Sequence, residues 1–308
     1  MKKHIFLGSF LIFSLALVVS GCVKNDLVKE SLDQKIKVTA TIFPLYDIVQ
    51  SVAGDKVDVK LILSPGSSPH TFEVSPQQVK DIQGTKVFFT IGQEVDSWVQ
   101  SLFQNTDNAE IFSVDKNINL QEFEHEDVEE SESGGGHEHK GTDPHYWLSP
   151  ENAVIITQDV LSKLIEIDPR NKAYYKRNAF DFINQLQSRS VDWKEKIKNL
   201  DNKELVVFHD AWGYFSKYFD LEVIATFEPF PGKTPSPRYL ADLQDNIKTH
   251  NTKALFVEPQ LSSEAVRALS EDLGINIAVL DPLGGVEGRN SYISLIDFNI
   301  ESIVSALK

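Results

Sequence analysis

The sequence predicts an α/β protein of two lobes, each a mostly parallel four-stranded sheet with flanking helices, joined by one long rigid helix. Short runs rich in Val, Ile and Phe alternate with amphipathic stretches, which is typical of βα units around a parallel sheet. These runs fall into two blocks. Between the blocks, the stretch from Pro169 to Leu200 has no internal proline or glycine, which favours one continuous helix.

The first block of strands belongs to an N-terminal lobe, residues 36–167, and the second to a C-terminal lobe, residues 201–308. A chain of 308 residues is long enough for two lobes with substantial apolar cores. The expected strands are Ile36–Ile42, Val57–Leu63, Val87–Ile91 and Glu110–Val114 in the first block, and Leu205–Phe208, Glu222–Thr226, Ala254–Glu258 and Asn276–Leu280 in the second.

Amphipathic helices are expected between these strands. Ser75-Pro76 and Ser236-Pro237 mark two helix starts, because a serine can cap free backbone N–H groups and proline fits the first turn. The expected helices are Pro76–Ile82, Glu94–Phe103, Pro237–His250, Ser263–Leu273 and Tyr292–Leu307.

The connecting helix is expected over residues 168–200 and would be a rod of roughly 45 Å. Such a rod would limit hinge motion between the lobes. Its apolar residues recur at roughly helical spacing and are Tyr174, Phe180, Ile183, Leu186, Val191 and Ile197.

The N-terminus is typical of an exported protein. Lysines precede an apolar run that is shorter than the roughly 20 residues of a membrane span, so residues 1–21 are interpreted as a signal peptide. The run ends in Val-Ser-Gly-Cys, which resembles the bacterial lipobox. Cys22 is the only cysteine, so we expect it to carry a lipid anchor, followed by a polar tether through residue 35. The expected location is the periplasm or the outer face of the plasma membrane.

Residues 116–141 are expected to form a flexible acidic loop within the first lobe, because the segment has a glycine run and too few apolar residues to pack. Its His125, His137 and His139 are candidate ligands for a weak auxiliary metal site. The alternative is a solvated linker.

Four side chains stand at turn-rich positions, three of them histidines. His70 and His145 each follow a proline, while His209 and Asp281 each close a predicted strand. Binding groups of open α/β sheets collect beyond the carboxyl ends of strands, and each block supplies two candidates, so we expect one site between the lobes. Three imidazoles and a carboxylate suit Zn²⁺, whereas Mn²⁺ prefers more oxygen. Each imidazole must bind in its neutral form, which predicts release of up to three protons per zinc at acidic pH.

The stretches around these residues resemble the four metal-ligand motifs of the zinc/manganese solute-binding lipoproteins of ABC transporters, the cluster A-I proteins. The similarity runs from about residue 36 to the C-terminus. Histidine at position 209 is similar to the zinc branch, since manganese-binding relatives commonly have glutamate there. The stretches are Pro69–Pro76, Asp143–Pro150, Phe208–Trp212 and Leu280–Gly284.

This resemblance implies a monomeric binding protein that captures Zn²⁺ between two lobes and delivers it to an ABC permease with a cytoplasmic ATPase. It also implies that the acidic loop stands where zinc-branch members carry a histidine-rich insertion. Asp143, Glu73 and Asp210 are near enough in sequence to orient the imidazoles. His250, at an expected helix end, is interpreted as structural, because a cationic imidazole suits the helix dipole there.

Three other functions have to be compared with this one. A net charge of −15 disfavours nucleic-acid binding. A zinc hydrolase would keep one metal position open for water, and the sequence has no His-Glu-x-x-His helix or Gly-x-Ser-x-Gly elbow. We therefore expect no enzyme. A manganese transporter lipoprotein with a secondary adhesin role is the remaining alternative.

Overall fold

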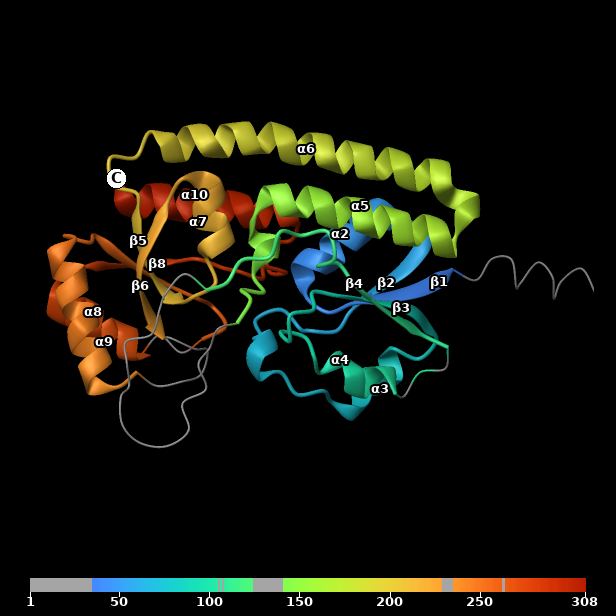
Figure 1. Ribbon diagram of the computed structural model, residues 1–308, viewed down its shortest axis with the longest axis horizontal. Coiled ribbons are helices and arrows are strands. Elements are labelled where there is room, and N and C mark those ends of the chain that lie inside the picture. The colour runs from blue at the N-terminus through green and yellow to red at the C-terminus, as the bar shows by residue number, and fades with distance from the viewer. Residues whose placement is uncertain (1–34, 105, 107, 124–140, 229–234, 262–263) are drawn as a thin grey trace, which may run out of the picture. The chain divides into compact units, whose positions relative to one another are not determined.

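The computed structural model describes residues 35–104, 106, 108–123, 141–228, 235–261 and 264–308. From residue 36 onward it contains two four-stranded sheets with flanking helices, which confirms the predicted fold class (Figure 1). The expected signal peptide, Cys22 and the tether through residue 34 lie outside the described residues. Within the described ranges, every helix is too short or too polar to cross a membrane.

The N-terminal sheet has the strand order β2-β1-β3-β4, and all its strand pairs are parallel. Its elements are β1 Ile36–Ala40, α2 Phe43–Ala53, β2 Val57–Leu61, α3 Pro76–Asp81, β3 Thr85–Thr90, α4 Val99–Phe103 and β4 Glu110–Ser113. α2 packs on one face of the sheet, and α3 and α4 lie across the other (Figure 1). As predicted, Ser75 caps α3 by accepting the backbone N–H of Gln78.

The C-terminal sheet repeats this arrangement, with the order β6-β5-β7-β8 and parallel pairs throughout. Its elements are β5 Glu204–His209, α7 Gly213–Phe219, β6 Glu222–Glu228, α8 Pro237–Thr249, β7 Ala254–Val257, α9 Glu264–Leu273, β8 Asn276–Val279 and α10 Tyr292–Leu307. α8 and α9 cover one face, and α7 and α10 the other (Figure 1). Ser236 caps α8 as expected, by accepting the N–H of Tyr239.

Two long helices link the halves. α5 (Pro150–Ile167) is followed by a 3₁₀ turn at Pro169–Asn171 and then by α6 (Lys172–Lys198), which packs against α2 and α5 as well as α7 and α10. Two apolar residues that suggested this helix are not in its buried stripe, since Phe180 is 64% and Val191 68% exposed. The buried residues instead recur at steps of three and four and are Tyr175, Ala179, Phe182, Leu186, Ser190, Trp193 and Ile197.

Two local predictions are wrong. The helix expected to begin at Glu94 begins at Val99, because Gln93 and Glu94 adopt positive φ angles of 49° and 67°, which interrupt a right-handed helix. The loop expected from residue 116 also begins later. Phe123 donates its N–H to the carbonyl of Gly141, and Glu122 and Thr142 form an antiparallel bridge, so the described ends of this segment form a paired stem.

A single apolar cluster extends through both lobes, from Val38 in β1 to Ile303 in α10. Direct hydrogen bonds add to it: the indole N–H of Trp147 donates to the carbonyl of Pro282 at 2.8 Å, and the hydroxyl of Tyr292 donates to the carbonyl of Trp147 at 2.7 Å. A close-packed interior has only small freedom to deform. Residues that project from the two lobes into one site are therefore held in a fixed relation.

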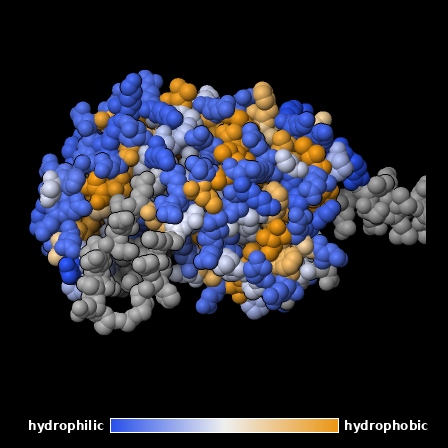
Figure 2. All heavy atoms as spheres, viewed as in Figure 1, coloured by the Kyte–Doolittle hydropathy of each residue, from blue (hydrophilic) through white to orange (hydrophobic). Residues whose placement is uncertain are grey.

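The surface offers a contrast to this interior. In Figure 2, hydrophilic residues cover most of the visible described surface, and hydrophobic ones are scattered among them. Scattered apolar residues are normal for a protein surface in water.

Candidate metal centre

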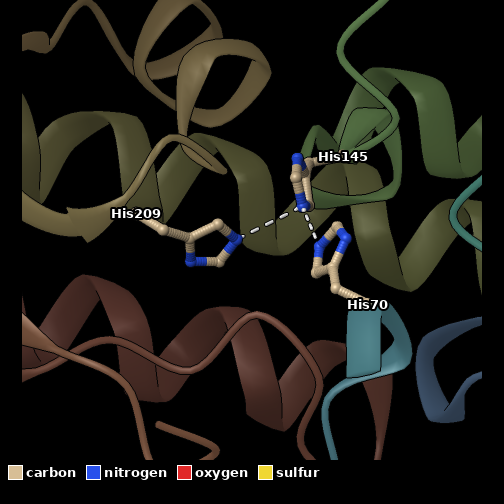
Figure 3. A group of neighbouring side chains, drawn as sticks. All are labelled: His70, His145 and His209. Carbon is tan, nitrogen blue, oxygen red and sulfur yellow. Dashed lines mark hydrogen bonds between the residues drawn. The ribbon is translucent and has the colours of Figure 1, made fainter. Parts of the chain in front are cut away.

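His70, His145 and His209 converge from three separate segments (Figure 3). His70 lies in a 3₁₀ turn, Pro69–Thr71, that follows β2, and His145 immediately precedes a second 3₁₀ turn, Tyr146–Leu148. His209 is the last residue of β5, so it stands at the carboxyl end of the C-terminal sheet, as the strand pattern predicts.

The three imidazoles direct their Nε2 atoms toward one another (Figure 3). The Nε2 atom of His145 lies 3.2 Å from that of His70 and 3.4 Å from that of His209. A tetrahedron with zinc–nitrogen bonds of about 2.0–2.1 Å has edges of about 3.3–3.4 Å. These two separations are therefore the ones that a single tetrahedral zinc ion would require of its nitrogen ligands.

A buried carboxylate orients His145. The Nδ1 atom of His145 lies 2.8 Å from Oδ1 of Asp143, which also accepts the backbone N–H of His145 at 2.8 Å. A hydrogen on Nδ1 leaves the lone pair on Nε2, which is the tautomer that binds a metal through Nε2. Asp143 was one of the predicted orienting residues, and its carboxylate lies where that role requires.

A second buried carboxylate, Glu258, stands beside His209. Oε1 of Glu258 lies 2.6 Å from Nδ1 of His209, although the ring N–H direction is poorly aligned with that oxygen. The indole of Trp212 donates to the same oxygen at 3.3 Å. Glu258 is not among the residues predicted from the sequence, although it directly follows β7 and thus stands at the same sheet edge as His209.

The electrostatic environment separates the three histidines. Burial, followed by the neighbouring imidazoles, lowers the pKa of His70 to about 2, even though part of the residue is exposed, because its ring faces the other two. Burial also lowers the pKa of His145. Burial acts in the same direction on His209, but the negative charge of Glu258 beside its Nδ1 atom outweighs burial and raises that pKa. His70 and His145 are thus neutral and ready for metal at physiological pH.

Water has limited access to the group. His145 and His209 are 2% and 3% exposed, whereas His70 lies at the rim. A cavity of about 10 Å³ adjoins the rings and is lined by Ser68, Pro69, His70, His145, Trp147, His209, Glu258, Gln260, Leu261, Pro282 and Leu283. Trp147 thus forms part of the wall, while Trp212 is not in the lining and donates its indole N–H to Glu258.

Asp281, the predicted fourth ligand, is not in the three-histidine group of the described residues. Its Oδ1 accepts the backbone N–H groups of Leu283 and Gly284 and the side-chain amide of Gln260, while its Oδ2 lies 2.9 Å from the guanidinium of Arg289. These partners hold the carboxylate away from the Nε2 atoms. A ligand role for Asp281 stays a prediction.

The remaining sequence candidates are dispersed. Glu73 is exposed, and Asp210 is close enough for its charge to raise the pKa of His209. His250 caps the C-terminus of α8, with its Nδ1 atom 3.1 Å from Glu204, which agrees with the structural interpretation. His125, His137 and His139 lie outside the described residues.

Comparisons with known proteins all find proteins named for metal uptake or metal binding. Residues 38–306 match the family model ZnuA, described as zinc-uptake complex component A, periplasmic. The chain is 30% identical to the high-affinity zinc uptake system protein ZnuA of Bacillus subtilis over 97% of both chains. It is 28% identical to the manganese ABC transporter substrate-binding lipoprotein PsaA of Streptococcus anginosus, over 100% of this chain and 99% of that protein. A zinc-bound crystal structure of a ZnuA deletion mutant superposes with a TM-score of 0.78 at 25% identity, covering 89% of this chain and 99% of the other.

The three-histidine group predicts that two exposed histidines, His70 and His250, differ greatly in their contribution to zinc affinity. His70→Ala removes one metal-binding nitrogen from the rim of the site. No buried carboxylate is paired with His70, so folding should be preserved. Zinc affinity should fall by more than about a hundredfold, since removing even an orienting partner costs 10–100-fold. His250→Ala is the matched control and should retain the affinity of the unaltered protein. Competition with a chromophoric zinc chelator measures both variants, and equal affinities would remove His70 from the site.

The pKa shifts revise the expected proton release. The raised pKa of His209 means that the metal-free protein holds a proton there as the pH falls toward 6, and zinc must displace it. Burial raises the pKa of Asp143 to about 7, so this carboxyl can release a second proton, whereas His70 and His145 have none to release in this range. The logarithm of zinc affinity should therefore fall by about one to two units per pH unit between about pH 5 and 7, rather than three.

Chelator competition at a series of pH values gives this slope. Asp143→Asn should reduce it to about one, because the amide oxygen still accepts the Nδ1 hydrogen of His145 but has no acidic proton. A slope of three would show that all three imidazoles are protonated in the metal-free protein, against the effects of burial described above.

Proposed function

The chain belongs to the family of zinc-uptake complex component A, and we propose that it captures a single Zn²⁺ ion with His70, His145 and His209 for an ABC importer. Zinc is the cargo of this protein rather than a resident cofactor. The relatives are named as components of uptake systems, so the family is one of transport proteins and not of enzymes.

The observation that carries this proposal is the spacing of the Nε2 atoms at 3.2 and 3.4 Å. Facing imidazole nitrogens at this distance cannot all be joined by hydrogen bonds, because a neutral ring with its hydrogen on Nδ1 has only an acceptor at Nε2. A cation at their centre turns this mutual repulsion into coordination. The carboxylates of Asp143 and Glu258, which lie beside the Nδ1 atoms of two of the histidines, also support metal binding by the Nε2 atoms.

The donor set favours zinc over manganese. Three neutral nitrogen ligands suit Zn²⁺, whereas Mn²⁺ prefers carboxylate, carbonyl and water oxygens. The two carboxylates nearest the rings, Asp143 and Glu258, contact the Nδ1 side of their histidines. A manganese-binding function, as in the name of the streptococcal relative, is therefore the less favoured alternative.

Delivery requires a membrane partner. We infer that the protein is held outside the cytoplasm by a lipid on Cys22 and passes zinc as a monomer to a permease driven by a cytoplasmic ATPase. This inference is supported by the lipobox-like sequence that ends at Cys22 and by the names of relatives as uptake-system proteins and transporter lipoproteins.

Metal titration tests the assignment. Zinc affinity alone is a poor discriminator, because most nitrogen-containing sites bind Zn²⁺ more tightly than Mn²⁺. The sharper measurement is the electron paramagnetic resonance signal of free Mn²⁺, which should stay undiminished when the protein is added in excess at micromolar concentration. Zinc should bind tightly at one ion per chain under the same conditions. Stoichiometric loss of the Mn²⁺ signal, or several equal tight zinc sites, would contradict the proposal.

The acidic histidine segment should be separable from the tight site. We expect replacement of residues 124–140 by two glycines to leave the melting temperature and the tight zinc ion unchanged, while weak additional zinc binding by His125, His137 and His139 disappears. A larger deletion, residues 121–139, serves as the contrast. It removes Gln121, whose carbonyl accepts the N–H of Asp143, and should lower both stability and zinc affinity. Loss of the tight ion in the smaller deletion would show that the segment supplies a required ligand.

A further inference from the structure

The side of α6 that faces away from the rest of the protein carries two large apolar residues. α6 packs its buried stripe on other helices and runs along one edge of the ribbon (Figure 1), where Figure 2 shows hydrophobic groups standing out among hydrophilic ones. Phe180 and Val191 are 64% and 68% exposed, the highest values for large apolar side chains among the described residues. They are separated by about three helical turns, so they share one face.

The charge of α6 is opposite to that of the chain. The helix has seven basic and three acidic residues, a net charge of +4, whereas the whole chain carries −15. Four exposed basic residues lie on the same side as the apolar pair, two of them before Phe180 and two after Val191. The outer face of α6 is therefore defined by Lys176, Arg177, Phe180, Val191, Lys194 and Lys198.

The positive charge of this face is not neutralised within the protein. In the described part of the chain, none of its four basic residues forms an ion pair. Arg177 lies 5.2 Å and Lys194 3.8 Å from the centre of a tyrosine ring, an interaction that leaves the charge in place. At about 100° per residue, the acidic residues of α6 lie roughly 60–120° around the helix from Phe180, to one side of the outer face.

The first turn of α6 lies at the end of the N-terminal lobe where the chain enters. Ile36, the first residue of β1, pairs with Val57, and the backbone N–H of Asp55 lies 3.5 Å from the hydroxyl of Tyr174 in α6. Cys22 precedes Ile36 by only 14 residues, which can span at most about 50 Å. A lipid on Cys22 would therefore keep this end of α6 close to a bilayer.

Charge decides which partner fits the outer face. A second copy of the chain is disfavoured, because basic residues stand at both ends of the face and would meet basic residues in either orientation of a helix pair. An anionic surface is complementary to it. The acidic remainder of the protein does not prevent such contact, since charges beyond about 8–10 Å are largely screened at physiological salt.

We propose that the outer face of α6 docks on the anionic phospholipid surface to which the protein is anchored. Lys176, Arg177, Lys194 and Lys198 contact lipid phosphates, and Phe180 and Val191 enter the boundary between headgroups and acyl chains, as in other interfacial helices. None of the residues that line the cavity at the histidines belongs to α6, so the docked protein keeps its metal site free. This inference goes beyond zinc capture and does not depend on it.

Partitioning into vesicles tests the role of charge. The exported chain, beginning at Cys22 with its thiol blocked, is sedimented with vesicles of phosphatidylcholine alone or mixed with phosphatidylglycerol. We expect binding only to the mixed vesicles, and its loss at about 1 M salt, where the screening length is about 3 Å. The double variant Lys176→Gln, Lys198→Gln should partition more than about tenfold more weakly, since each basic residue near an anionic surface contributes roughly fivefold.

The matched control has the same net charge. Lys80→Gln, Lys86→Gln removes two exposed lysines of the N-terminal lobe, from α3 and β3, and should partition within about twofold of the unaltered chain if position and not total charge matters. Equal losses in the two double variants, or equal binding of the unaltered chain to both kinds of vesicle or to neither, would overturn the proposal.

The orientation is tested on the anchored protein. Cys22 is the only cysteine, so it can be coupled to a maleimide lipid in mixed vesicles whose acyl chains carry bromine, which quenches tryptophan on contact. Phe180→Trp should gain quenched emission. Ile277→Trp, at an exposed apolar position of β8, should gain emission that is not quenched. Equal quenching of both, or a blue shift of Phe180→Trp that grows with protein concentration without vesicles, would contradict docking and in the second case assign the face to another copy.

Zinc titration separates this inference from the proposed function. Every variant above should bind zinc with the affinity of the unaltered protein, which also shows that it is folded. Failure of the unaltered protein to bind zinc would contradict the proposed function and leave the vesicle results to decide membrane docking by themselves.

Discussion

Three imidazole lone pairs that face one another in a buried space are the arrangement on which the rest of the structure depends. Neutral Nε2 atoms at 3.2 and 3.4 Å repel, and a proton shared by one pair leaves the third nitrogen unsatisfied. The arrangement persists because two of the three rings are fixed from behind. Asp143 sets the tautomer of His145, and Glu258 with Trp212 braces His209. Burial keeps His70 and His145 neutral, which spares zinc most of the competition with protons.

Fixed rings require a fixed relation between lobes, and the two sheets achieve it through their shared core. Each sheet delivers its functional side chains at the carboxyl ends of its strands, and the same strand order in both halves faces these ends toward one site. The bond from Trp147 to Pro282 joins a wall of the site directly to the segment that follows β8. Because α6 packs on helices of both halves, opening the site by separating the lobes would disrupt a continuous apolar cluster.

The sequence was sufficient for the class of fold, both strand blocks and the three histidines, because these depend on local patterns and on a general rule about strand ends. It was insufficient where contacts with residues far away in the sequence determine the position of a side chain. Asp281 resembles a ligand in its motif, yet Arg289 and Gln260 hold its carboxylate elsewhere. Glu258 ends a predicted strand and Gln260 closely follows it, but only their side-chain contacts distinguish them from ordinary turn residues. The late start of α4 reflects positive φ angles at Gln93 and Glu94, for which their residue types give no signal.

The three histidines differ in what restrains them, and this difference bears on how an ion enters and leaves. His145 and His209 are almost completely buried and lie against carboxylates, so moving either ring would leave a buried acidic group without its partner. His70 lies in a 3₁₀ turn and is exposed at the rim of the site. Displacing His70 therefore costs less than displacing either of the others. A site that is rigid on two sides and adaptable on the third can exchange its ion through local movement of the turn at Pro69–Thr71, while the lobes stay packed.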